Sequence, residues 1–172
     1  MDMTGSVSTH IAAPPDRVFA AITDLRRLPG WNRRMTGVVE VPEELVAGSE
    51  WVVGFRYLGR RFNSRSVVTQ MGKADRLFAY RSKPEDDNPS CTAWTWHVEP
   101  EDDGSRVTVG WQLMPATLLR RVLLAPLRAY QIPRVDLARS LAALASRCEV
   151  VATATHTPER GLQGGSDPQD VR

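Results

Sequence analysis

The most constraining feature of this sequence is a long amphipathic segment near its C-terminal end, Pro126 to Glu149. One set of positions recurs at alternating intervals of three and four residues, the spacing of one face of an α-helix. At ~1.5 Å per residue this helix would be ~36 Å long, so burying one face requires a broad apolar surface such as a sheet. The predicted buried face is Leu127, Tyr130, Arg134, Leu137, Leu141, Leu144 and Cys148.

Arg134 stands on this face where a leucine would be expected. In one interpretation its aliphatic stem packs on the protein while its guanidinium reaches water. In the other interpretation the charge points into a cavity under the helix. The neighbouring Pro133 lacks a backbone donor, so we expect a kink near residues 129–131.

Upstream of this helix, the hydrophobic period changes from 3.6 to 2 at Thr36. Three elements are predicted before this change: a first strand at 6–11, a helix opened by Pro14 and Pro15, and a short helix from Asp24, as its N-cap, to Leu28. Short turns between the later strands predict an antiparallel meander. Those strands are 37–41, 50–58, 61–70, 76–82, 91–99 and 106–114. The pattern therefore predicts an α+β fold, in which an antiparallel sheet of about seven strands packs against the long C-terminal helix.

Composition indicates a soluble globular protein with one domain. The chain has 172 residues, of which 42% are apolar and 24% charged. A net charge of +2 is too small to imply a nucleic-acid partner. No run of ~20 uncharged apolar residues predicts a membrane span, and the N-terminus lacks the features of a signal peptide. We expect a cytoplasmic protein, with a domain over residues 1–151 and a disordered tail over 152–172.

Motifs for metal or nucleophile chemistry are missing from the sequence. The histidines, His10, His97 and His156, are far apart, and no pair has the spacing of metal ligands. Cys91 and Cys148 fall in apolar periodic segments and are expected to be buried, reduced thiols. No phosphate-binding loop follows a strand, and no Gly-x-Ser-x-Gly elbow is present. We therefore predict no metal and no cofactor.

Alternation along the strands places aromatic residues on the inner face of the sheet. Four of the five tryptophans fall on that face, and Trp31, directly after a helix stop, is expected at the border of the same region. Either these rings fill the core, or several of them line a pocket for a flat or hydrophobic ligand. The strand at 76–82 is ambiguous, because Phe78 and Tyr80 oppose Arg81. The predicted ligand-binding residues are Trp31, Trp51, Phe55, Tyr57, Ser64, Ser66, Arg81, Trp94, Trp96, Trp111, Tyr130, Arg134 and Leu137.

The order of elements and four short segments resemble the START-like (SRPBCC) superfamily, in particular its polyketide cyclase/dehydrase branch. The segments are IAAPPDRVFAAITD at 11–24, LPGW at 28–31, GSEW at 48–51 and SLAAL at 140–144. The resemblance covers about residues 4–150. It implies the helix-grip fold, in which the curved sheet wraps around the long C-terminal helix and encloses a hydrophobic cavity whose contents differ between members.

Three functions remain open from the sequence. The first is binding or transport of a hydrophobic small molecule, such as a lipid, a quinone or a polyketide-like compound. The second, implied by the resemblance, is a polyketide cyclase, aromatase or dehydratase, with Arg134 or Arg81 stabilising an enolate and Tyr57 or Tyr130 relaying a proton. The third is lipid delivery, with peripheral membrane contact through Leu118–Leu124. The identity of the ligand and the oligomeric state stay open.

Overall fold

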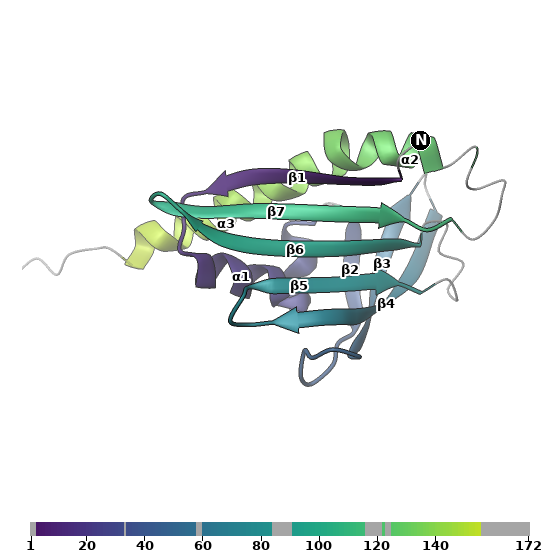
Figure 1. Cartoon of the computed structure of the whole chain (residues 1–172). Coiled ribbons are helices and arrows are strands. Elements are labelled where there is room, and N and C mark those ends of the chain that lie inside the picture. The colour runs from purple at the N-terminus through teal and green to yellow at the C-terminus, as the bar shows by residue number, and fades with distance from the viewer. Residues whose placement is uncertain are drawn as a thin grey trace, which may run out of the picture.

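A computed structural model describes residues 3–32, 34–57, 60–83, 91–115, 122 and 125–155. It contains a seven-stranded antiparallel sheet of order β1-β7-β6-β5-β4-β3-β2, curved around the long C-terminal helix (Figure 1). Consecutive strands pair from β2 to β7, and β1 adds at the free edge of β7. The strands are β1 (Thr4–Ile11), β2 (Met35–Glu40), β3 (Glu50–Tyr57), β4 (Arg60–Gly72), β5 (Leu77–Ser82), β6 (Thr92–Glu101) and β7 (Gly104–Leu113). The predicted α+β meander and helix-grip architecture are confirmed.

Two short helices connect β1 to β2. Helix α1 (Pro15–Thr23) begins with a proline, which is tolerated because the first helical N–H has no intrahelical partner. A 3-10 helix (Leu25–Gly30) follows and includes Pro29. Within the described structure Asp24 makes no side-chain capping bond to this helix, contrary to its predicted role, and instead forms an ion pair with Arg27. The turn after Gly30 leaves Trp31 only 2% exposed.

The C-terminal helix is continuous from Ala125 to Thr155 but changes type in the middle. Helix α2 (Ala125–Gln131) leads into a π segment (Ile132–Leu137) and then α3 (Ala138–Thr155). Pro133 lies in the π segment, where its missing N–H interrupts the α-helical ladder. The wider turn lets Ile132 and Leu137, five residues apart, both be buried, although they would lie ~140° apart around an uninterrupted α-helix.

This change of type corrects the first half of the predicted buried face. Leu137, Leu141, Leu144 and Cys148 are buried as expected. Tyr130 is 58% exposed, and Arg134 is exposed with it. The prediction from the 3,4 spacing assumed one α-helical period along the whole helix. The π segment instead rotates the residues before it around the helix axis relative to those after it.

The core lies between the inner face of the sheet and the helices. It contains side chains from α1, from the C-terminal helix and from alternate strand positions, including Trp96, Val98 and Val107. Cys91 and Cys148 are both buried, as expected. Among the described residues no helix is long and apolar enough to cross a membrane. Residues 152–155 of the tail predicted to be disordered belong to α3. The rest of that tail, and Leu118–Leu124 apart from Val122, lie outside the described residues.

Candidate functional site

A pocket lies between the concave face of the sheet and the C-terminal helix, with a volume of about 160 Å³. That volume is similar to the roughly 150 Å³ of an engineered apolar cavity that binds benzene. Arg56 and Leu127 line the pocket and are exposed, so the pocket reaches the surface beside them. Its apolar lining includes Trp31, Met35, Val53, Phe55, Phe62, Trp94, Trp96, Leu113, Ala125, Leu127 and Leu137.

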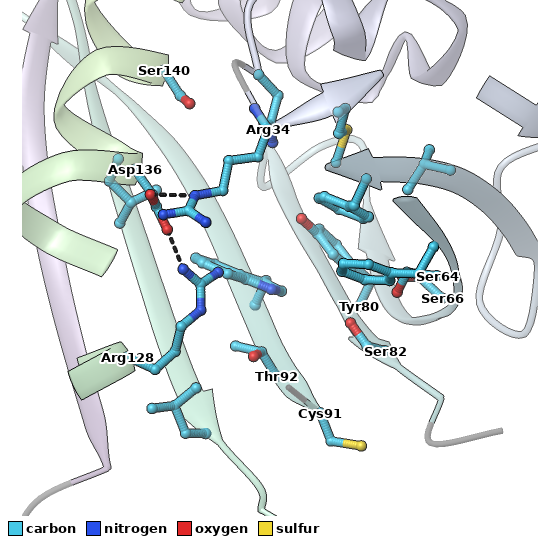
Figure 2. A pocket seen from close by; sticks show the side chains of 18 of the residues that line it. Arg34, Ser64, Ser66, Tyr80, Ser82, Cys91, Thr92, Arg128, Asp136 and Ser140 are labelled. Carbon is cyan, nitrogen blue, oxygen red and sulfur yellow. Dashed lines mark hydrogen bonds and ion pairs between the residues drawn. The ribbon is translucent and has the colours of Figure 1, made fainter. Parts of the chain in front are cut away.

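An ion-pair cluster occupies the helix side of this pocket (Figure 2). Asp136 lies in the π segment, and its two carboxylate oxygens accept from different arginines. Arg34 Nε, just before β2, donates to Oδ1 at 2.5 Å, and Arg128 Nη1, in α2, donates to Oδ2. The side chains of Arg34, Asp136 and Arg128 are 24%, 12% and 20% exposed. We call these three residues the Asp136 cluster.

The π segment brings the helical members of this cluster together. Arg128 and Asp136 are eight residues apart. At ~100° per residue an uninterrupted α-helix would place them about 80° apart around the axis. The wider π turn reduces that angle, so both side chains reach the pocket.

Hydroxyl groups line the sheet side of the pocket. Ser64 and Ser66 occupy alternate positions of β4 and are 2% and 4% exposed, because successive inward positions of a strand are two residues apart. Ser82 at the end of β5 and Thr92 at the start of β6 extend the same polar region. Figure 2 shows Ser64, Ser66 and Ser82 on the strands and the Asp136 cluster on the helix side of the cavity. Ser140 adds one hydroxyl from α3.

Tyr80 adds a phenol to the pocket from β5. Burial raises the pKa of Tyr80 to about 12, and a hydrogen bond with the Trp96 side chain partly opposes that rise. The phenol therefore keeps its proton at neutral pH. Trp96 also packs edge-on against Trp31, with 5.6 Å between ring centroids. The Trp31 indole nitrogen is buried and has no hydrogen-bond partner in the part of the chain that the structure describes.

The structure brings seven of the predicted ligand-binding residues to the pocket. They are Trp31, Phe55, Ser64, Ser66, Trp94, Trp96 and Leu137. Trp51 is buried beside Tyr80, with 4.9 Å between ring centroids, and borders a much smaller cavity. Trp111 is buried against Gly5 of the neighbouring strand, outside the pocket lining.

The remaining predicted residues lie elsewhere. Arg81 is exposed, because Tyr80 and Ser82 take the inward positions of β5. Arg134 lies over the Tyr130 ring, 4.3 Å from its centroid, in a cation–π contact between two exposed residues. The guanidinium of Arg134 thus reaches water, as in the first interpretation of its sequence position. The side chain of Tyr57 lies outside the described part of the structure.

Sequence reasoning missed the charged residues of the site. Arg34 lies in a connection without periodicity, and Arg128 and Asp136 fall off the face that a pure α-helical period predicts. One missed residue had a usable signal. Phe78 and Tyr80 are two residues apart in the strand at 76–82, and residues two apart on a strand point to the same side of a sheet.

The polar groups of the pocket are arginines, hydroxyls, one phenol, one carboxylate, the amide of Asn32 and the thiol of Cys91, a set with few metal-ligating side chains. Within the described ranges no group of three or more His, Cys, Asp or Glu side chains is arranged to hold a metal ion.

Comparisons with known proteins agree with this architecture. A family model described as polyketide cyclase / dehydrase and lipid transport matches residues 3–149. A protein from Thermus thermophilus has a similar structure, with a TM-score of 0.70 and 19% identity, covering 87% of this chain and 99% of that one. The Zhui aromatase/cyclase from a Streptomyces species gives a TM-score of 0.70 and 17% identity, covering 89% and 97%.

A third similar structure is a START superfamily protein from Mycobacterium smegmatis, with a TM-score of 0.69 and 14% identity, covering 86% of this chain and 98% of that one. At these identities the structural matches show the shared fold. No match was found among curated proteins.

Proposed function

Because this chain belongs to the polyketide cyclase / dehydrase and lipid transport family, we propose that it binds a hydrophobic small molecule between its sheet and its C-terminal helix. The observation that carries this proposal is the pocket of about 160 Å³ with a mainly apolar and aromatic lining. Concave, mostly apolar pockets with a few polar groups are the usual sites for small molecules.

The lining favours a flat, ring-containing ligand over a simple hydrocarbon chain. Trp31, Trp94 and Trp96 present large aromatic surfaces, on which a ring can stack edge-on or with an offset. Burial of each additional CH₂ or equivalent apolar area contributes ~0.8 kcal/mol. A quinone or a polyketide-like aromatic compound fits this description better than a lipid acyl chain does.

A neutral fluorescent probe tests the proposal directly. N-phenyl-1-naphthylamine is apolar and fluoresces more strongly when it leaves water, so titration of the protein with this probe should show saturable binding. The variant Ser66→Phe puts a ring into the pocket and should abolish binding. Its matched control, Ser8→Phe, adds the same ring at an exposed position of β1 and should bind like the wild type. Absence of saturable binding, or equal binding by a folded Ser66→Phe variant, would contradict the proposal.

Catalysis on a polyketide-like substrate is the second candidate, favoured by the Tyr80 phenol in the same pocket. Transfer of a proton from the carbon between two carbonyl groups to a water molecule gives an enolate, which Arg128 can stabilise while the Tyr80 O–H donates to its oxygen. Arg134 and Arg81, the arginines suggested for this role by the family resemblance, are exposed and lie outside the pocket lining.

A short poly-β-ketone thioester is a suitable test substrate. Mass spectrometry would detect loss of water, and absorbance would detect formation of an aromatic ring. Tyr80→Phe should lower the rate by at least about 100-fold, in the range usual for acid–base catalysis. Tyr130→Phe, at an exposed position, should leave the rate unchanged. Lack of product, or equal rates in wild type and Tyr80→Phe, would contradict this candidate and leave the binding proposal standing.

A further inference from the structure

The described charged residues that line the pocket are unbalanced in sign. They are Arg34, Arg56 and Arg128 against the single carboxylate of Asp136. Tyr80 adds no charge at neutral pH, because its phenol stays protonated. The chain as a whole carries a net charge of only +2, so this excess of positive charge is concentrated at the pocket. A mainly apolar cavity with a positive lining favours a ligand that is itself both apolar and negatively charged.

We propose that the ligand carries an anionic group, such as a carboxylate or sulfonate, on an apolar ring-containing body, and that the Asp136 cluster binds this group. The inference rests on the proposed function and names the chemical class of the ligand. It follows from the placement of two arginines, held by one carboxylate, on one side of the mainly apolar pocket.

The geometry of the cluster holds two guanidinium groups close together. Each oxygen of Asp136 accepts from a different arginine, so the carboxylate bridges Arg34 and Arg128. Two cations and one anion leave the cluster with a formal charge of +1. A guanidinium has five N–H donors in a planar fork, and Arg128 donates one of them, from Nη1, to Asp136. An incoming anion therefore brings the cluster to neutrality and can accept from the fork of Arg128.

Partial burial makes the charge of the cluster effective. The three side chains are between 12% and 24% exposed, and they face a cavity with mainly apolar walls. Charges in such a position are less screened by water and salt than those on an open surface. Asp136 also keeps the arginines oriented before a ligand arrives, so less side-chain entropy is lost on binding.

The opposite wall gives the ligand an orientation. The described residues on the sheet side of the pocket contribute neutral hydroxyls, from Ser64 and Ser66 among others, and no carboxylate; their one cation, Arg56 of β3, is exposed at the surface. The charged end of the ligand should therefore point to the helix, while its ring lies against Trp94 and Trp96. Neutral oxygen substituents at the far end of the ring can hydrogen-bond with the serines.

Two probes of nearly the same shape isolate the effect of charge. 8-Anilino-1-naphthalenesulfonate carries a sulfonate that N-phenyl-1-naphthylamine lacks, and both are measured by fluorescence titration of the intact chain. We expect the wild type to bind the sulfonate at least about tenfold more tightly than the neutral probe, the order of one charge-assisted hydrogen bond. Arg128→Gln should abolish this preference, measured as the ratio of the affinities for the two probes.

Further variants separate charge recognition from a structural role. Asp136→Asn removes the competing carboxylate and should increase the preference for the sulfonate, whereas damage to the pocket would weaken the binding of both probes. Arg128→Lys keeps the charge and should retain most of the preference. Arg139→Gln removes an exposed cation of α3 outside the pocket and should behave like the wild type.

The possible outcomes are distinct. Failure of the neutral probe to bind contradicts the proposed function itself. If the neutral probe binds and the wild type shows no preference for the sulfonate, or if Arg128→Gln shows the same preference as the wild type, the anionic ligand class is wrong. If Arg128→Gln does not fold, as judged by circular dichroism, Arg128→Lys and Asp136→Asn decide. The inference is supported if Arg128→Lys retains the preference for the sulfonate and Asp136→Asn increases it. A decrease of this preference in Asp136→Asn overturns the inference.

Discussion

Arg34 and Asp136 lie 102 residues apart in the sequence, and a hydrogen bond from Arg34 Nε to Asp136 Oδ1 joins them on the helix side of the pocket. One partner precedes β2, at the edge of the sheet, and the other lies in the π segment of the C-terminal helix. The contact therefore ties the helix to the sheet at the place where the pocket lies between them. Arg128 binds the other oxygen of the same carboxylate, so Asp136 is the shared member of both ion pairs.

Because Asp136 is shared by both ion pairs, we expect its substitution to cost more stability than substitution of either arginine of the cluster. Asp136→Ala leaves two partly buried guanidinium groups without their common partner and should lower the free energy of unfolding by about 2–3 kcal/mol. Arg34→Ala and Arg128→Ala each leave one ion pair intact and should cost about 1 kcal/mol. Urea unfolding at neutral pH measures the three values. Equal costs for all three variants would show that the carboxylate does not bridge the arginines in solution.

Tyr80 predicts a loss of stability in alkaline solution. Its pKa is raised to about 12 in the folded protein by burial, against ~10 in an unfolded chain. Between these values the unfolded state has lost the phenolic proton and the folded state still holds it, so stability falls as pH rises. The contribution of Tyr80 is fully present below pH ~10 and is lost progressively towards pH 12, with a slope of at most ~1.4 kcal/mol per pH unit.

The measurement for Tyr80 is urea unfolding at a series of pH values above about 9, just below the usual pKa of tyrosine. Tyr80→Phe removes the titrating group, so its stability should fall less steeply with pH than that of the wild type. Tyr130→Phe, at a position 58% exposed, serves as the matched control and should keep the wild-type slope. A Tyr80→Phe variant whose slope equals that of the wild type would mean that the phenol is not shielded from water.

Gly104, at the start of β7, predicts a steric effect at the end of the sheet remote from the pocket. A Cβ atom there would lie 2.3 Å from the backbone oxygen of Ile11, which cannot move without displacing β1. Gly104→Ala should therefore cost about 2 kcal/mol or more of stability. Gly37→Ala is the control, because a Cβ at Gly37 meets nothing within 4 Å. Thermal unfolding of both variants measures the difference, and a Gly104→Ala variant as stable as Gly37→Ala would contradict the close approach.

The fold could be predicted from the sequence because its signals are local and repeated. Alternation at period 2 located β6 and β7 and their inward residues, among them Trp96 and Val107. The second half of the C-terminal helix followed its α-helical period, and Leu141 and Leu144 are buried as expected. In each case the hydrophobic effect imposes the same periodic pattern that the backbone geometry requires.

The charged part of the candidate site could not be predicted in the same way. Arg34 meets Asp136 only because the whole sheet curves towards the helix, and such a long-range contact has no local pattern. Arg128 and Asp136 share a face only because the helix widens at the π segment. A period of 3.6 instead selected Tyr130 and Arg134, which contact each other on the exposed side. The proline at 133 marked the irregular point, but it predicted a kink and not a shift of register.

The π segment itself leads to the last prediction. Val135 lies in this segment and is not a core residue, so deleting it removes one residue of chain and leaves the core side chains in place. In a continuous α-helix Ile132 and Leu137 would then be four residues apart, ~40° around the axis, so both would stay on the buried face. Deleting the exposed Ala142 from the regular helix α3 would instead rotate Leu141 by ~100° relative to Leu144. We expect the Ala142 deletion to lower the free energy of unfolding by several kcal/mol and the Val135 deletion to lower it by clearly less. Urea unfolding compares the two variants, and a Val135 deletion as destabilising as the Ala142 deletion would show that the π segment does not hold one extra residue.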